Sequence, residues 1–349
     1  MKTEHLLIMR FTALGEVAML VPVVSSLAQQ YPELRITVLS NPFARPLFDG
    51  IAHNVGFMAA DLNGEYHGVK GLNALYRRLV AKNFTAIADM QSILRSSYLR
   101  MRFNISSYRV EHLDNHRQDR RQLIASKDKR LKQLPSLFDD YTDVLARLGY
   151  NVRLDFQSLF PPTGGNLRLV SDRIGEKKMF QQWIGIAPFA AFRGKVYPVQ
   201  LTERVIAELI RRHPSCRIFL FGGGDAEMAQ IDRWCAQYKN CTNASQLLGS
   251  VQQELIVMSH LDVMLSMDSV NMHLASIAGT RVVSLWGATH PYAGYLGYGQ
   301  SHDDVIQTDL DCRPCSLHGN RLCKRGDYAC LTQIDPISVA DHVEKHLKH

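Results

Sequence analysis

The chain alternates short apolar runs with amphipathic segments, and this alternation constrains its fold more than any other feature. Apolar runs of strand length are typical of buried parallel strands, and apolar residues repeated every three to four positions are typical of helices. In the first half, the predicted strands are residues 5–11, 35–39, 55–60, 84–90 and 106–110. Strict alternation of strand and helix predicts right-handed crossovers and an α/β fold whose parallel sheet is covered on both faces.

The same alternation restarts after a linker that is rich in Pro and Gly. Residues 151–178 contain Pro-Pro and Gly-Gly pairs, which interrupt regular structure. Beyond the linker, the predicted strands are residues 183–187, 216–221, 262–267, 281–286 and 305–308. We therefore predict two Rossmann-like, doubly wound domains, residues 1–160 and 161–349. Because ligands bind at the carboxyl ends of such strands, we expect the two domains to face each other across a cleft.

Composition and charge narrow the class of protein. The chain has 349 residues, of which 46% are hydrophobic, and its longest apolar runs fall short of the roughly 20 residues of a membrane span. Arg10 interrupts the first apolar run and no small-residue cleavage site follows it, so we expect no signal peptide, a cytoplasmic protein and reduced cysteines. The formal net charge of +7 favours an anionic partner, whether a nucleic acid, a membrane surface or a phosphorylated substrate.

The basic residues gather in two stretches. One contains Arg95, Arg100 and Arg102, and the other runs through Arg117, Arg120 and Arg121 to Lys132. The second stretch has no aromatic residue that could stack on bases, which argues against nucleic acid as the partner. An anion-binding role and a solvated loop and helix surface remain open for it.

The stretch from residue 261 to 278 is the strongest candidate for a ligand site. An apolar run, predicted to be a buried strand, ends at Asp268 and Ser269, and an amphipathic helix containing His273 follows at once. Such a junction offers backbone N–H groups, the positive end of a helix dipole and an imidazole to one anion, and a diphosphate would suit it. The alternative is an ordinary capped turn with an incidental histidine.

Three further strand ends carry candidate residues. Glu16 lies in the first turn of a predicted helix, where a carboxylate tends to be ionised and could accept a proton from a sugar hydroxyl; alternatively it only caps its helix. Arg193 and Lys195 lie on a strand-to-helix loop where each could meet a phosphate, or they are surface charges. Asp225 follows three glycines and could bind ribose hydroxyls, although the glycine spacing lacks the full dinucleotide pattern.

Four cysteines close to one another invite a zinc interpretation. Cys312, Cys315, Cys323 and Cys330 have the spacing C-x2-C-x7-C-x6-C. Zinc ribbons normally repeat the C-x2-C knuckle, and here the second pair is spread apart. A reduced or partly bonded structural cluster and a zinc site both remain open.

Taken in order, four motifs resemble glycosyltransferase family 9, the ADP-heptose:lipopolysaccharide heptosyltransferases. Residues 12–16, Thr-Ala-Leu-Gly-Glu, stand for the family's Ser-Ser-Leu-Gly-Asp, and residues 195–198, Lys-Val-Tyr-Pro, stand for Lys-x-Trp-Pro. Residues 268–275, Asp-Ser-Val-Asn-Met-His-Leu-Ala, resemble Asp-Ser-Gly-Pro-x-His-Leu-Ala, and residues 286–289, Trp-Gly-Ala-Thr, resemble Phe-Gly-Pro-Thr. Many family members also have a cysteine-rich tail.

The resemblance implies a GT-B fold with an acceptor-binding N-terminal domain and a donor-binding C-terminal domain. It implies an inverting, metal-independent transfer of a sugar, heptose by analogy, from an ADP-sugar to a lipopolysaccharide core or related glycolipid. The implied residues are Glu16 as general base, with Lys195, Arg193, Asp225, Asp268, Ser269 and His273 at the donor. We expect Arg95, Arg117, Arg120 and Arg121 to bind an anionic glycolipid acceptor, with no nucleic acid, no metal and no cofactor, peripherally on the inner membrane.

Two departures from the family motifs keep other functions open. Glu16 is one methylene longer than the family's aspartate, and Val270 and Asn271 replace Gly-Pro, which narrows the room beside the phosphate. A donor sugar other than heptose therefore remains open. A nucleotide-sugar epimerase of similar fold and a catalytically weak glycan-assembly protein are the alternatives.

Overall fold

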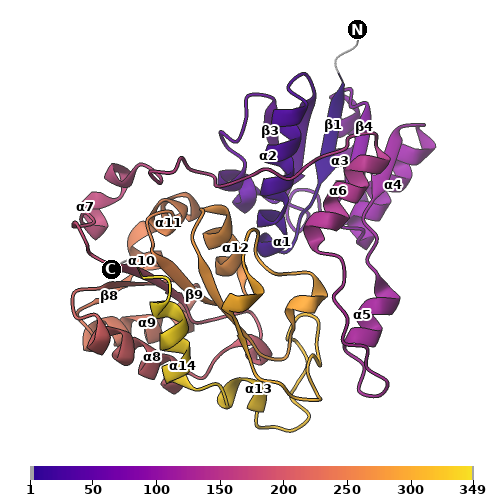
Figure 1. Cartoon of the computed structure of the whole chain (residues 1–349). Coiled ribbons are helices and arrows are strands. Elements are labelled where there is room, and N and C mark those ends of the chain that lie inside the picture. The colour runs from indigo at the N-terminus through magenta and orange to yellow at the C-terminus, as the bar shows by residue number, and fades with distance from the viewer. Residues whose placement is uncertain (1–3, 348–349) are drawn as a thin grey trace. The chain divides into compact units, whose positions relative to one another are not determined.

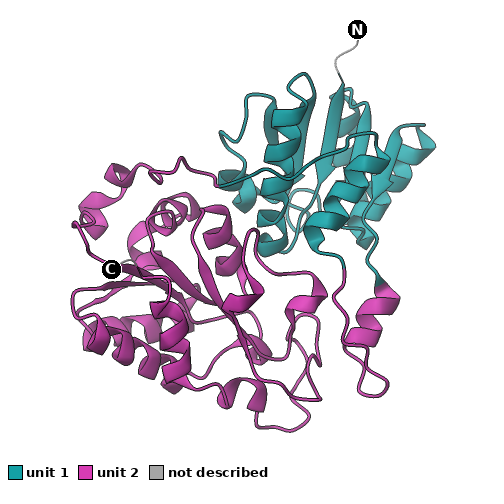
Figure 2. Cartoon of the chain, viewed as in Figure 1, with its two compact units in different colours: residues 1–116, 135–157 teal, residues 117–134, 158–349 magenta. Residues whose placement is uncertain are grey.

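The computed structural model describes residues 4–347 and divides the chain into two compact units (Figures 1 and 2). The first contains residues 1–116 and 135–157, and the second contains residues 117–134 and 158–349. Every strand pair in both units is parallel, which confirms the predicted α/β class with two parallel sheets. Within residues 4–347, no helix has the length and apolar character that crossing a bilayer requires.

The first unit is a five-stranded sheet in the order β3-β2-β1-β4-β5 with helices packed on it (Figure 1). Its strands are β1 (His5–Met9), β2 (Arg35–Ser40), β3 (Val55–Ala59), β4 (Ala86–Asp89) and β5 (Arg109–His112). Its helices are α1 (Leu14–Ala18), α2 (Leu20–Gln30), the 3-10 helix η1 (Pro42–Leu47), α3 (Gly68–Val80), α4 (Leu94–Ile105) and α6 (Leu137–Arg147). The central strand β1 is buried along its whole length, as its apolar run predicts.

The second unit is a six-stranded sheet in the order β11-β10-β9-β6-β7-β8. Its strands are β6 (Trp183–Ala187), β7 (Arg217–Leu220), β8 (Cys241–Asn243), β9 (Val263–Met267), β10 (Val282–Trp286) and β11 (Val305–Gln307). Its longer helices are α8 (Val199–Arg212), α9 (Asp225–Gln237), α11 (Val251–Met258), α12 (Val270–Ile277) and α14 (Pro336–Glu344). Its shorter ones are α5 (Arg117–Leu123), α7 (Ser171–Ile174), α10 (Ala244–Leu248) and α13 (Ala329–Thr332), with the 3-10 helices η2 (Leu167–Leu169), η3 (Arg193–Lys195), η4 (Pro291–Ala293) and η5 (His302–Asp304).

Some elements differ from the sequence prediction for identifiable reasons. The single helix expected over 16–30 is divided into α1 and α2 near Met19, because Pro22 has no N–H to continue the hydrogen-bond ladder. The short helix expected over 42–49 is the 3-10 helix η1, which contains Pro46. Strand β8 was missed because it has three residues and little apolar signal.

The basic segment 117–134 groups with the second unit, although the sequence prediction placed it within residues 1–160. The backbone N–H of Leu134 donates to the carbonyl of Tyr292 at 2.9 Å, and Lys129 Nζ donates to the carbonyls of Asp311 and Arg313 at 2.9 and 2.8 Å. Helix α5, at the start of this segment, lies where a loop was expected. The acceptor and donor roles of the two domains stay predictions.

Each sheet has one point where its strand order reverses. In the first unit β1 lies between β2 and β4, and in the second unit β6 lies between β7 and β9. Loops that leave the carboxyl ends of the two strands beside such a switch point diverge and form the binding region of open α/β sheets. The fold thereby selects residues 10–16 with 89–91 in the first unit, and residues 188–198 with 268–273 in the second.

Candidate functional site

Glu16 lies at the switch point of the first unit, in the first turn of α1. The backbone N–H of Ala13 donates to Glu16 Oε2 at 3.1 Å, so the carboxylate does cap its own helix. The same oxygen forms an ion pair with Arg10 Nη2, and the Glu16 side chain remains 22% exposed. Both contacts stabilise negative charge on an accessible carboxylate, so the capping role and the proposed general-base role are compatible.

Arg10 is the residue at this switch point that the sequence analysis did not select. Its side chain is only 5% exposed, and its guanidinium contacts both Glu16 and the carbonyl of Met90, beyond the end of β4. Tyr141 of α6 lies beneath the guanidinium, 5.8 Å from its ring centroid, and donates its hydroxyl to the Glu16 carbonyl at 3.0 Å. The signal in the sequence was a charged residue directly after a buried apolar strand.

The loop after β4 completes the support of this site. Gln91 accepts the backbone N–H of Phe11 at 2.8 Å and donates to Thr12 Oγ1 at 2.5 Å. Asp89, fully buried, accepts the backbone N–H groups of Gln91 and Ser92 and pairs with Arg100. The two strand-end loops are therefore tied to each other side chain by side chain, which fixes where Glu16 points.

Lys195 and Asp268 come together at the switch point of the second unit. Lys195 Nζ lies 3.1 Å from Asp268 Oδ2, and the side chains are 16% and 8% exposed. Lys195 arrives on the loop after β6, and Asp268 directly follows β9. Two of the predicted donor residues from different loops thus share one ion pair at the predicted edge of the sheet.

Close backbone packing holds the Lys195 loop in place. The carbonyl of Gly194 accepts the backbone N–H of Ala288 at 2.8 Å. A Cβ on Gly194 would lie 2.8 Å from the Gly319 carbonyl oxygen and 3.0 Å from Ala288 Cβ, so this contact requires glycine. The loop after β10, residues 287–289, and the cysteine-rich segment near Gly319 therefore both support Lys195.

Ser269 and His273 follow Asp268 at the entry of α12. Ser269 is the N-cap residue in an extended conformation, and its side chain makes no capping hydrogen bond; Ser266 Oγ lies 3.3 Å from its Oγ. His273 is 6% exposed, one turn into the helix. The predicted capped strand-to-helix junction is confirmed as local structure, and its role in binding a diphosphate stays a prediction.

The loop after β10 also carries a buried histidine. Burial, followed by the positive charge of Arg313, lowers the pKa of His290 to about 4. His290 Nδ1 accepts the backbone N–H of Tyr292 at 3.1 Å, which requires that nitrogen to be unprotonated. The imidazole is therefore neutral at neutral pH, and this loop gains no positive charge from it.

Asp225 and Arg193 are placed less directly for a ligand. Asp225 is exposed at the start of α9, while the neighbouring Glu227 accepts the backbone N–H of Gly223 at 2.8 Å. Arg193 stacks on Tyr328 at 4.7 Å from the ring centroid and donates to its own loop at the Val196 carbonyl. Their predicted contacts with ribose and phosphate stay predictions.

The predicted acceptor residues are divided between the two units. Arg95 in α4 donates to Asn63 Oδ1 at 2.7 Å and to the Leu62 carbonyl at 3.2 Å. In α5 of the second unit, Arg120 donates to the Tyr295 hydroxyl at 2.7 Å, whereas Arg117 and Arg121 are exposed. The basic residues thus do not form one surface within a single unit.

Comparison with known proteins follows this geometry. The profile described as Glycosyltransferase family 9 (heptosyltransferase) matches residues 72–324. The lipopolysaccharide core heptosyltransferase OpsX of Haemophilus influenzae is 21% identical over 295 residues, covering 82% of this chain and 80% of that protein.

Solved structures agree on the fold. A family 9 glycosyltransferase from Veillonella parvula has a TM-score of 0.73 at 16% identity, covering 99% of this chain and 98% of that one. ADP-heptose lipopolysaccharide heptosyltransferase II of E. coli has a TM-score of 0.68 at 16% identity, with the same coverage. E. coli heptosyltransferase WaaC with ADP has a TM-score of 0.65 at 16% identity, covering 98% and 99% of the two chains. With the GT-B fold in common and the family profile matched over most of its length, the chain belongs to glycosyltransferase family 9 and is a glycosyltransferase.

Proposed function

We propose that this glycosyltransferase transfers a heptose from an ADP-sugar to a lipopolysaccharide core or related glycolipid, with inversion at the anomeric carbon. The observation that carries the proposal is the Lys195–Asp268 ion pair at the switch point of the second unit, beside the start of α12. A relative is named as a lipopolysaccharide core heptosyltransferase, and the structure of E. coli WaaC is described with ADP. These names support ADP as the nucleotide and a lipopolysaccharide core as the acceptor.

Donor binding falls to the second unit. The Lys195 ammonium and the N-terminus of α12 supply positive charge for a diphosphate, and Asp268 holds the lysine in place. Ser269 and His273 line the entry of the helix, Arg193 adds a second cation, and Asp225 meets the ribose hydroxyls. As the bond between sugar and diphosphate breaks, negative charge develops on the departing ADP. Fixed protein charges that stabilise it allow transfer without a catalytic metal ion or other cofactor.

Glu16 serves the acceptor. Its carboxylate accepts the proton of an acceptor hydroxyl while that oxygen attacks the anomeric carbon from the side opposite to the diphosphate. One carbon–oxygen bond forms as another breaks, the proton moves to Glu16, and the configuration inverts in this single displacement. Arg10 and the Ala13 N–H keep the carboxylate in place before the attack.

The donor half of the proposal is tested by ADP titration with calorimetry. Lys195→Ala removes a charge-assisted contact worth about 1.5–3 kcal/mol, so we expect ADP affinity to fall about 10-fold or more. His273→Ala should weaken ADP binding as well. Lys177→Ala is the matched control, because Lys177 forms an equivalent ion pair with Asp262 at 3.0 Å in the same unit. Unchanged affinity in both site variants would show that the donor site is placed wrongly.

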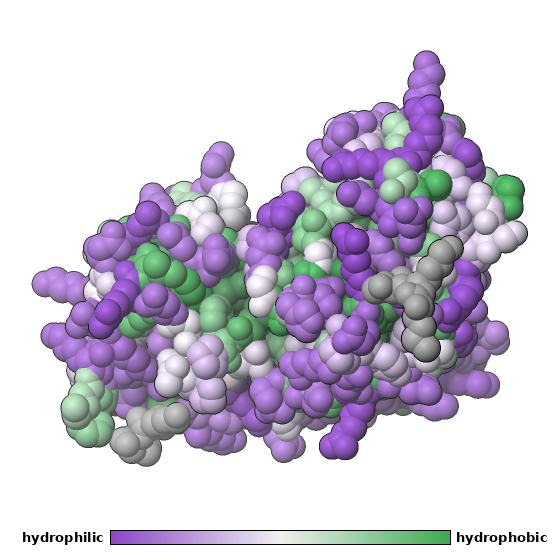
Figure 3. Space-filling model, turned by 90° about the horizontal axis from the view of Figure 1, so that it is seen from above, coloured by the Kyte–Doolittle hydropathy of each residue, from purple (hydrophilic) through white to green (hydrophobic). Residues whose placement is uncertain are grey.

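Peripheral attachment to the cytoplasmic face of the inner membrane is part of the proposal, because the acceptor is lipid-linked. Helix α4 supports it. Leu94, Met101 and Ile105, spaced seven and four positions apart on one helix face, are 88%, 48% and 73% exposed. The helix carries three arginines and no acidic residue, so an anionic lipid surface matches its charge. Figure 3 shows apolar residues between hydrophilic ones on the surface in view.

A further inference from the structure

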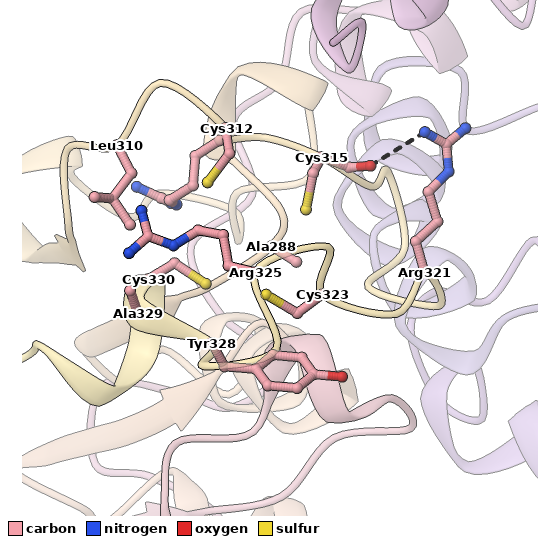
Figure 4. Close-up of a pocket in the computed structure, with 11 residues that line it drawn as sticks. Ala288, Leu310, Cys312, Cys315, Arg321, Cys323, Arg325, Tyr328, Ala329 and Cys330 are labelled. Atoms are coloured by element: carbon pink, nitrogen blue, oxygen red, sulfur yellow. Dashed lines mark hydrogen bonds between the residues drawn. The ribbon is translucent and has the colours of Figure 1, made fainter.

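Four cysteine side chains converge on one small cavity in the second unit. Cys312, Cys315, Cys323 and Cys330 all line a cavity of about 20 Å³, room for one body of water or ion size. Figure 4 shows their four sulfur atoms directed into the same space. All four are free thiols in the structure. The irregular spacing of the second pair in sequence is therefore no obstacle to a shared site, because the chain folds back to bring it beside the first.

The cluster would have to contract to take up an ion. Among residues 4–347, no three His, Cys, Asp or Glu side chains are already spaced to hold a metal ion. Cys312 is exposed, and Cys315 and Cys323 are partly so, on a segment that forms no regular helix or strand between β11 and α13. Side-chain rotation on this segment brings the sulfurs inward without moving the sheet.

Positive charge surrounds the thiols, as a tetrathiolate site requires. Four thiolates around a divalent ion carry a net charge of −2 (4 × −1 and +2). Arg313 and Arg325 line the cavity, and Lys129 donates to the carbonyls of Asp311 and Arg313 on both sides of Cys312. Burial raises the pKa of Cys330 to about 11 and raises that of Cys315. Without a metal ion these two thiols stay protonated, which does not suit a nucleophilic role.

We propose that Cys312, Cys315, Cys323 and Cys330 bind one thiophilic transition-metal ion, Zn²⁺ or iron, in a tetrahedral structural site. Each thiol releases its proton to solvent as its sulfur–metal bond forms, and no electron is transferred. Four protein ligands leave no open position, so the ion holds the segment together and takes no part in sugar transfer.

This site supports the donor-binding loops. Arg313, between the first two cysteines, is 5% exposed and donates to the carbonyls of Trp286 and Thr289 at 3.1 and 3.0 Å. The backbone N–H of Cys315 donates to the carbonyl of Ala288 at 3.0 Å. Gly319, between Cys315 and Cys323, packs against the stem of Lys195. Fixing the four cysteines therefore fixes the surface on which Lys195 rests.

The test is the metal content of the full-length protein, purified without chelator and measured by elemental analysis. We expect about one equivalent of zinc or iron per chain, and the element found distinguishes the two. Cys312→Ser is the first variant, because an exposed side chain disturbs packing least, and Cys323→Ser is the second; each should lose most of the metal. Cys235→Ser, which alters a half-buried cysteine of the same unit outside the cluster, should keep it.

A second measurement does not depend on how variants fold. Wild-type protein freed of metal under reducing, anaerobic conditions is titrated with Co²⁺, and a tetrahedral thiolate site gives intense sulfur-to-metal charge-transfer absorption. Full-length protein that neither contains zinc or iron nor binds Co²⁺ would overturn the proposal, as would two disulfides among the four cysteines. In a separate arm, which rests on the proposed donor site, metal removal should weaken ADP binding; metal binding without this effect overturns only the link to the donor loops.

Discussion

At the scale of single residues, Glu16 shows how one side chain can have two roles that its sequence position does not separate. It caps α1 through the Ala13 N–H and pairs with Arg10, yet its carboxylate remains partly accessible. Sequence reasoning found the carboxylate but not the arginine behind it, because a buried guanidinium at a strand end is defined by tertiary contacts. Tyr141, which lies beneath that guanidinium, is more than a hundred residues away in the chain.

The two roles of Glu16 make different predictions. We expect Glu16→Gln to keep the fold and the ADP affinity but to lower turnover about 100-fold, because the amide cannot accept the proton. The matched control is Asp139→Asn: Asp139 accepts the backbone N–H of Ser136 at 2.9 Å in the equivalent cap of α6. Turnover assays with thermal unfolding compare them, and near-normal turnover in Glu16→Gln would reduce Glu16 to a cap.

Gly319 tests whether the cysteine-rich segment supports Lys195. Gly319 has φ +77°, and a Cβ there would lie 2.5 Å from Lys195 Cγ; Gly326 has φ +81° with nothing within 4 Å. Alanine at either position brings backbone strain of about 1–2 kcal/mol, but only Gly319→Ala displaces the lysine. We expect Gly319→Ala to weaken ADP binding by calorimetry while Gly326→Ala leaves it unchanged. Equal affinities would show that Lys195 does not depend on this contact.

At the scale of elements, the long buried strands were predictable and the short or polar elements were not. Strands β1, β6 and β9 are continuous apolar runs, and their positions follow from that pattern. Helix α5 carries mainly polar and charged residues, and it is positioned by contacts such as that of Arg120 with Tyr295, 175 positions along the chain. Periodicity reports local burial and is silent about such partners, so the basic segment 117–134 could not be assigned to its unit from sequence.

The membrane proposal is tested at these same elements. Wild-type protein should co-sediment with anionic vesicles at low salt and lose this binding well before about 0.5 M salt, where charges are strongly screened. Neutralising the exposed Arg117 and Arg121 together should weaken binding, as should Leu94→Asn with Ile105→Asn on α4. Arg233→Gln with Lys239→Gln, which removes two exposed charges elsewhere in the second unit, is the control. Wild-type protein that ignores anionic vesicles at low salt would contradict the proposal.

At the scale of the whole molecule, the two-sheet architecture followed from repeated alternation, and the switch points followed from topology. The order β3-β2-β1-β4-β5 and its counterpart in the second unit place Glu16, Lys195 and Asp268 where strand order reverses. The motifs predicted which residues to examine, and the sheets explain why those residues stand at strand ends. The tight backbone contacts of Gly194 and the convergence of four cysteines required the folded chain.

The central claim, sugar transfer by single displacement, is tested most directly by the configuration of the product. The full-length protein is incubated with ADP-heptose and a purified lipopolysaccharide-core acceptor, and the anomeric configuration of the new bond is determined by NMR. The account predicts a transferred heptose whose anomeric configuration is opposite to that of the donor. A product that retains the configuration of the donor, or no transfer from ADP-heptose while ADP binds, would contradict it.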